Sequence, residues 1–233
     1  MKFNVVKILN DIESLFFPDA CLACFNSLVY NEKIICVSCR HQLPLTNYHL
    51  YNDNPVEKVF HGRINIENAT ALLSYRGSGT VKNLIHYLKY KGYEEIGELL
   101  GKMMGFELSK TSSFSGINMV LPVPLHPKRL KKRGYNQVAL FGKQIALALE
   151  ASYDDTIIYR KVNSETQTFK NRLMRWQHKE HVFEARETEL LANRHILLVD
   201  DVVTTGATIE ACAYALRDVP NLKISIATMA ITE

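Results

Sequence analysis

The chain has 233 residues, of which 47% are hydrophobic and 22% are charged, and this composition is typical of a globular protein. A chain of this length builds one sizeable α/β core with a small accessory module, so two equal domains are not expected. The 28 basic and 24 acidic residues leave a formal net charge of +4. This mild excess is compatible with a polyanionic partner but does not require one.

The first seventeen residues carry apolar side chains at helical spacing, with acidic residues between them. Such interrupted apolar positions, with no small-residue cleavage site after them, do not fit a signal peptide. We expect an amphipathic helix that packs against the rest of the protein, and a helix lying on a membrane surface is the alternative. No later segment approaches the roughly 20 apolar residues that cross a bilayer. The sequence therefore predicts a cytoplasmic protein.

Four of the five cysteines form two C-x2-C pairs separated by eleven residues, namely Cys21, Cys24, Cys36 and Cys39. This spacing is typical of a tetrahedral zinc site, in which the ion replaces the core that so short a segment cannot build. Two disulfides are the alternative, but they would need an oxidising compartment. Because four thiolates leave no open position, we predict structural Zn²⁺. His41 could replace one ligand but is expected on the surface, and Cys212 is expected in the core of a helix.

We divide the chain into a helix and zinc-binding module at 1–45, a linker at 46–68 and a main domain at 69–233. In the main domain, strand and helix patterns alternate, which predicts an α/β fold with a mainly parallel sheet flanked by helices. The segment 161–181 is polar and shows no clear element. The expected strands are 69–75, 117–123, 157–159, 195–199 and 222–231, and the expected helices are 81–88, 94–108, 136–149 and 208–216.

The apolar strand 195–199 is followed directly by two carboxylates, Asp200 and Asp201. Open α/β sheets bind ligands at this edge. The next loop, 204–208, is rich in threonine, contains Gly206 and leads into a helix. Backbone N–H groups, hydroxyls and the helix dipole therefore converge on an anion site of phosphate size. Carboxylates beside such a site fit a ribose 5-phosphate group, whose hydroxyls can donate to them, or a bridging metal ion.

Two other interpretations of this segment are weaker. An acidic turn before a capped helix explains the aspartates and threonines separately, but not their combination after a buried strand. A Walker-type phosphate loop is excluded because the G-x-x-x-x-G-K-[ST] pattern is missing.

Five cations fall within six residues directly after the proline-rich turn at 121–127. Such a basic loop is suited to stabilise the charge that develops on a diphosphate leaving group. For any one of these side chains, a solvated loop is an equally good interpretation. The five are Lys128, Arg129, Lys131, Lys132 and Arg133.

The run from His195 to Thr208 resembles the phosphoribosyl pyrophosphate (PRPP) signature of type I phosphoribosyltransferases. The segments LKYKG at 88–92, LPVPLHPKRL at 121–130 and RGYNQ at 133–137, behind a four-cysteine module, resemble the ComF family of competence proteins, ComFC-like. The match covers nearly the whole chain. The middle segment fits at Thr166, Gln167, Arg172, Arg175 and Phe183, whereas Lys170 and His178 stand where Leu and Asn are usual.

The resemblance implies a type I phosphoribosyltransferase-like fold that binds PRPP with Mg²⁺. As an enzyme, the protein would transfer the phosphoribosyl group to an unidentified nitrogen base and release diphosphate. Asp200 and Asp201 would be the catalytic residues that hold the ribose hydroxyls, and the loop 161–181 would close over the substrate. The implied PRPP-binding residues are Val199, Asp200, Asp201, Val202, Val203, Thr204, Thr205, Gly206, Ala207, Thr208, Lys128, Arg129 and Arg133.

The same resemblance implies a role in natural transformation, with DNA-uptake machinery at the inner membrane. In this alternative the protein binds single-stranded DNA without catalysis and uses the PRPP site as a sensor. Cations for the backbone and aromatic rings for the bases favour such binding, and residues 82–93 interleave the two. Aromatic residues beside lysines on a helix are, however, usually partly buried. The expected contacts are Lys82, Lys89, Lys91, Lys131 and Lys132.

Overall fold

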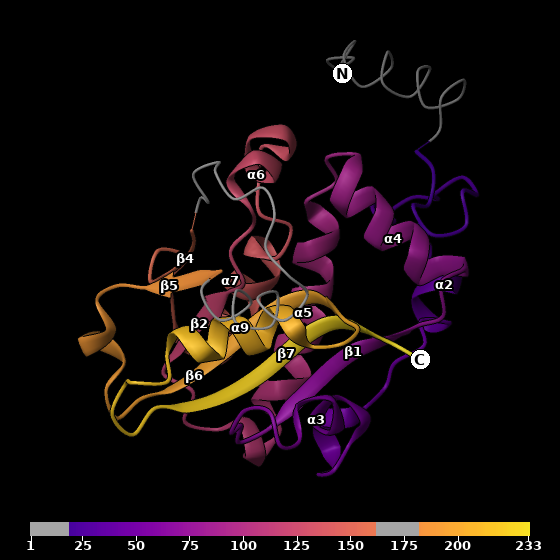
Figure 1. Cartoon of the computed structure of the whole chain (residues 1–233). Coiled ribbons are helices and arrows are strands. Elements are labelled where there is room, and N and C mark those ends of the chain that lie inside the picture. Colours follow the sequence, from indigo (N-terminus) through magenta and orange to yellow (C-terminus); the bar gives the residue numbers. More distant parts are fainter. Residues whose placement is uncertain (1–18, 162–181) are drawn as a thin grey trace, which may run out of the picture.

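The computed structural model describes residues 19–161 and 182–233 (Figure 1). The predicted N-terminal helix lies outside the described residues, and so do Thr166, Gln167, Lys170, Arg172, Arg175 and His178 of the proposed closing loop. The helices are α2 (Val37–His41), η1 (Tyr48–Leu50), α3 (Pro55–Phe60), α4 (Gly79–Tyr90), α5 (Glu95–Ser109), η2 (Ser112–Phe114), α6 (Pro127–Arg133), α7 (Ala139–Ala148), η4 (Thr188–Leu191) and α9 (Ala207–Ala215).

Five strands form one parallel sheet in the order β1-β7-β6-β2-β3. They are β1 (Ala69–Tyr75), β2 (Met119–Pro122), β3 (Ser152–Tyr153), β6 (His195–Val203) and β7 (Lys223–Thr232). A separate antiparallel pair joins β4 (Ile158–Arg160) to β5 (Phe183–Ala185). The central strands β6 and β7 are apolar along most of their length because both of their faces are covered. The predicted mainly parallel sheet flanked by helices is confirmed.

Helices cover the sheet on both faces (Figure 1). One core contains α4, α5 and α7, and the other contains α3, α9 and the β4–β5 pair. The helices α5 and α7 approach so closely that a Cβ atom at Gly101 would lie 2.7 Å from the carbonyl oxygen of Phe141. Because α4 and α9 lie on opposite faces of the sheet, residues of each helix can approach the carboxyl end of β6 from their own side.

The cysteine module shares a core with α4 instead of standing apart. Cys21 and Cys39 are buried in the same cluster as Leu84, and the Asn83 side chain of α4 donates a hydrogen bond of 2.8 Å to the Ala23 carbonyl. The module is thus positioned by the helix that also reaches the sheet edge.

The segment 46–68, predicted as a linker, contains η1 and α3. Asn54 caps α3 by accepting from the N–H groups of Val56 and Glu57, and its own amide donates to the Ala69 carbonyl of β1 at 2.9 Å. Pro55 at the first helical position could have been recognised as a helix start, since its fixed φ suits that position. The division of the chain into domains stays a prediction.

Two elements near the expected site differ from the sequence prediction. The basic loop is the short helix α6, which begins at Pro127 and ends at Arg133, and its C-cap Gly134 has a left-handed φ of +89°. Strand β6 continues through both aspartates to Val203, because it stays paired with β7 up to Ile231. In the described part of the chain, no helix is both long enough and apolar enough to span a membrane.

Candidate functional site

Asp201 is buried at the carboxyl end of β6 and holds two donors. The Lys89 ammonium of α4 lies 2.8 Å from its Oδ1 atom, and the Gln137 amide donates to its Oδ2 atom at 2.6 Å. Gln137 in turn accepts a hydrogen bond from Arg133 of α6. Neither partner of Asp201 was predicted, because strand and helix positions far apart in sequence give no sign of this contact.

As a whole residue, Asp200 is half-buried and Asp201 is buried. Successive strand residues face opposite sides of a sheet, so Asp200 lies toward α9 while Asp201 lies toward α4. Loss of solvation, and then the neighbouring charge of Asp201, raise the pKa of Asp200 to about 8. Its Oδ1 atom also accepts the N–H of Asp201 at 2.8 Å, which opposes this rise. The raised pKa favours the protonated form of the Asp200 carboxyl at neutral pH.

The loop 204–208 has the form expected of an anion cradle. The three threonines are exposed, and α9 begins at Ala207, so N–H groups of its first turn are available to a ligand. Gly206 has a φ of +71°, and a Cβ atom there would lie 2.6 Å from carbons of Val59 and Phe60. Only glycine meets both constraints. The exposed threonines are Thr204, Thr205 and Thr208.

Arg63 binds the loop 204–208 through a backbone carbonyl, and this contact was not predicted from the sequence. Its guanidinium donates to the carbonyl oxygens of Val59 at 2.9 Å and Thr205 at 2.5 Å, and it pairs with Glu210 of α9. The planar guanidinium has several N–H donors that point in different directions, so one arginine can bind acceptors on separate segments. Arg63 therefore joins α3, the loop and α9 into one support.

The predicted ligand-binding residues outside the loop 204–208 differ in how exposed their side chains are. The side chains of Val199 and Val203 are buried in the sheet, so only their backbones could face a ligand, whereas Val202 is partly buried. Lys128 and Lys131 are exposed on α6.

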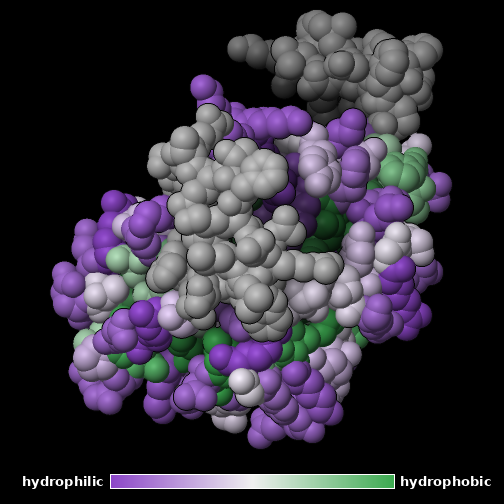
Figure 2. All heavy atoms as spheres, viewed as in Figure 1, coloured by the Kyte–Doolittle hydropathy of each residue, from purple (hydrophilic) through white to green (hydrophobic). Residues whose placement is uncertain are grey.

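A basic cavity of about 330 Å³ lies between α4 and α6. The described residues that line it carry four cations and no carboxylate, namely Lys89, Tyr90, Gly92, Arg129, Lys132, Arg133 and Tyr135. Figure 2 shows a hydrophilic surface around α6 at this side of the molecule. Because Lys89 also contacts Asp201, the cavity adjoins the acidic end of β6. Of the predicted cations, the structure thus brings Arg129 and Arg133 together with Lys89 and Lys132.

Aromatic rings continue from the cavity toward the cysteine module. The ring centroids of Phe25 and Tyr87 lie 5.9 Å apart, and those of Tyr87 and Tyr93 lie 5.4 Å apart. His86 lies 5.2 Å from Tyr90. The predicted contacts Lys82 and Lys91 are exposed nearby on the same stretch of chain.

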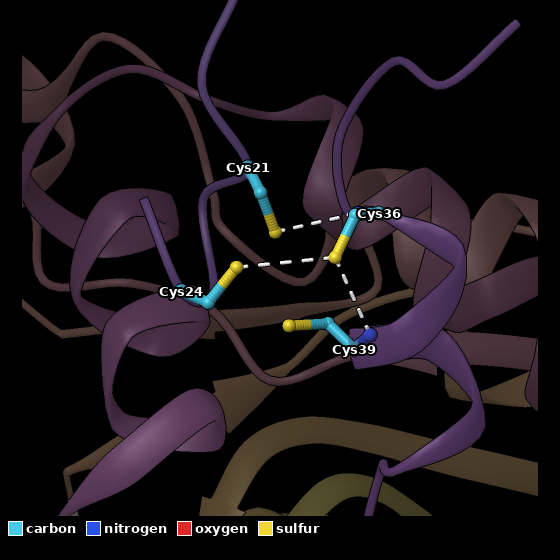
Figure 3. Close-up of side chains that lie close together, drawn as sticks. All are labelled: Cys21, Cys24, Cys36 and Cys39. Atoms are coloured by element: carbon cyan, nitrogen blue, oxygen red, sulfur yellow. Dashed lines mark hydrogen bonds between the residues drawn. The ribbon is translucent and has the colours of Figure 1, made fainter. Parts of the chain in front are cut away.

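The four cysteines of the N-terminal module converge on one point (Figure 3). Their sulfur atoms all lie within 4.8 Å of one another, and those of Cys24 and Cys36 are 3.8 Å apart. A tetrahedron with metal–sulfur bonds of about 2.3 Å has edges of about 3.8 Å. The four thiols are free, so this group could hold a metal ion.

The charges of these thiols depend on one another. Burial raises the pKa of Cys21. Several backbone N–H groups, among them that of Cys36 at 3.3 Å, have a larger opposing effect and bring this pKa down to about 6. Burial and the neighbouring thiols raise the pKa of Cys39. Four such thiols cannot all ionise without a cation among them. His41 is exposed, and Cys212 is buried in the second core, as predicted.

A parallel α/β sheet with an acidic strand end and a threonine-glycine cradle is typical of phosphoribosyltransferases. Residues 138–231 match the family model of the phosphoribosyl transferase domain. The chain is similar to proteins named as competence proteins, as its motifs predicted.

Three relatives illustrate the similarity. The DNA utilization protein YhgH of Escherichia coli (strain K12) is 28% identical over 79% of this chain and 78% of its own. Competence protein ComFC of Bacillus subtilis (strain 168) is 26% identical over 88% and 87%, and competence protein F of Haemophilus influenzae is 28% identical over 58% and 60%. A solved glutamine PRPP amidotransferase from B. subtilis shares 14% identity over 63% of this chain and 30% of its own, with a TM-score of 0.43.

Proposed function

We propose that the protein binds PRPP with Mg²⁺ at the carboxyl edge of β6. The observation that carries this proposal is the alignment of three kinds of group along one edge. The Thr204–Thr208 cradle suits the 5-phosphate, Asp200 and Asp201 suit the ribose hydroxyls, and the basic cavity suits the diphosphate. Mg²⁺ would neutralise part of the diphosphate charge when it is bound.

Calorimetric titration with PRPP and Mg²⁺ tests this proposal. We expect binding by the wild type and none by the double variant Asp200→Asn/Asp201→Asn. Asp218→Asn is the matched control, because Asp218 is an exposed aspartate whose side chain pairs only loosely with Arg217 at 3.6 Å. No binding by the wild type would refute the proposal.

Phosphoribosyl transfer to a nitrogen base is the activity that such a site would support. In that reaction the base displaces diphosphate at C1 of the ribose, and cations beside the diphosphate stabilise the departing charge. Measurement of diphosphate release with a panel of bases tests it. Release with one base would establish an enzyme, and binding without release would favour a sensor.

The names of the relatives, DNA utilization protein and competence protein, support a role in competence or DNA utilization. We propose that the protein acts in natural transformation, in the cytoplasm and in contact with DNA-uptake machinery at the inner membrane. A specific observation favours binding of single-stranded DNA. The basic cavity continues into exposed rings, including Tyr90 and Tyr93, and Arg133 lies 5.7 Å from the centre of the Tyr90 ring. Cations and stacked rings are the two components of single-strand binding. Affinity for an oligonucleotide should fall steeply with salt, and a flat dependence would contradict this function.

We also propose that the four-cysteine cluster holds structural Zn²⁺. Tetrahedral thiolate spacing favours zinc, and four protein ligands leave no position for substrate. Metal analysis of the purified protein should give one zinc per chain.

A further inference from the structure

Lys89 belongs to two parts of the site at once. Its Nζ atom lies 2.8 Å from Oδ1 of Asp201, and its side chain also lines the basic cavity with Arg129, Lys132 and Arg133. The side chain of Asp201 is 9% exposed and that of Lys89 is 22% exposed, so the ion pair is largely shielded from water. In this state Lys89 occupies one oxygen of a carboxylate that a ribose hydroxyl would need.

The neighbours of the pair allow Lys89 to leave while Asp201 stays in place. Gln137 holds the other oxygen of Asp201 at 2.6 Å, so the carboxylate remains oriented. The backbone beside Lys89 is fixed, because the Tyr135 hydroxyl donates to the Leu88 carbonyl. A lysine ammonium moves on a flexible four-carbon stem, so its Nζ atom can turn into the cavity without a shift of α4.

The ligand proposed above has its two anionic groups at opposite ends of the ribose, a phosphate on C5 and a diphosphate on C1. With the phosphate in the cradle and the hydroxyls at the aspartates, the diphosphate would lie on the side of Asp201 that faces Lys89. A ligand with a diphosphate offers Lys89 a new partner when the sugar takes its place on Asp201. Ribose 5-phosphate offers none, and its binding would have to break the ion pair without compensation.

We propose that Lys89 determines specificity for a sugar phosphate that carries a second anionic group, by exchanging Asp201 for that group when the ligand binds. This inference rests on the proposed PRPP site and gives Lys89 a role there, in addition to the nucleic-acid contact expected from the sequence. No covalent bond forms or breaks in the exchange.

Affinities of Lys89→Met for three probes test the exchange: PRPP, ribose 5-phosphate and inorganic diphosphate, each with Mg²⁺. Ribose 5-phosphate is measured by its displacement of PRPP, which reports weak binding. We expect at least a tenfold loss of affinity for PRPP and diphosphate, and unchanged or tighter binding of ribose 5-phosphate. Lys89→Arg, which keeps the cation, should restore most of the preference for PRPP.

Lys102→Met is the matched control, because Lys102 forms a 2.5 Å ion pair with Glu98 on the exposed side of α5. It should leave all three affinities unchanged. Equal weakening of PRPP and ribose 5-phosphate by Lys89→Met, in a variant that unfolds like the wild type, would reduce Lys89 to a structural residue and overturn the inference. Unchanged PRPP affinity would overturn it too. Failure of the wild type to bind PRPP is a different result, because it refutes the site itself.

Discussion

At the scale of single residues, the two aspartates differ more than their adjacency in sequence suggests. Asp201 is neutralised by Lys89, whereas desolvation and the charge of Asp201 raise the pKa of Asp200. A carboxyl group whose pKa is raised in the folded state lowers the free energy of unfolding at every pH at which the unfolded carboxyl is ionised. The unfolded carboxyl ionises near its ordinary value of 3.8, so the wild type loses stability as the pH rises from there to about 8.

Asp200→Asn should therefore raise the free energy of unfolding relative to the wild type. The gain should grow as the pH increases from about 5 to about 8 and then level off. Urea denaturation across this range measures it. Asp201→Asn should act in the opposite direction at neutral pH, since it leaves the Lys89 ammonium without its carboxylate. A gain from Asp200→Asn that does not change with pH would mean that Asp200 is ionised in the folded protein.

Gly206 combines a left-handed backbone with close contacts from α3. Gly206→Ala should lower the free energy of unfolding by about 2 to 4 kcal/mol, because left-handed backbone strain of about 1 kcal/mol adds to an overpacking cost of about 1 to 3 kcal/mol. Gly62→Ala is the control, since Gly62 has a φ of +69° but nothing within 4 Å of an added Cβ atom. It should lose only the backbone part. Equal losses for both variants in chemical denaturation would contradict the role of Val59 and Phe60.

At the scale of elements, α3 supports the loop 204–208, which we propose as the phosphate cradle. Arg63→Ala removes the link from α3 to the Thr205 carbonyl and to Glu210. We expect weaker binding of PRPP, by about tenfold, because the loop no longer keeps one conformation and ordering it costs about 1 to 2 kcal/mol per residue. Calorimetry measures the loss. Arg76→Ala, which removes the exposed ion pair with Glu233, should bind PRPP like the wild type.

A short helix such as α3 is difficult to recognise from sequence, because six residues show little periodicity. The long apolar strands were predicted well, since burial on both faces requires an apolar run. Helix α6 was predicted as a loop, because its short sequence PKRLKKR is mostly cationic and has no repeating apolar positions. Packing against the rest of the fold decides such short elements.

At the scale of the whole molecule, the cysteine module and α4 share one core. Metal binding should therefore stabilise α4, which reaches the carboxyl end of β6, as well as the module. Cys36→Ser should lose zinc, melt at a lower temperature and expose the amides of α4 to faster hydrogen exchange. Cys212→Ala is the control, because Cys212 lies in the other core. It should keep one zinc per chain. A change in exchange confined to residues 19–42 would show that the module is independent of α4.

The sequence by itself determined the class of fold, the metal-type spacing of the four cysteines and the strand end with its cradle. These features depend on local chemistry, namely apolar runs, ligand spacing and a glycine before a helix. The tertiary structure decided which groups share the site. Lys89 and Gln137 meet Asp201, and Arg63 meets the loop 204–208, from positions 64 to 142 residues away in the chain. No local pattern encodes such contacts, because they exist only once the helices have packed on both faces of the sheet.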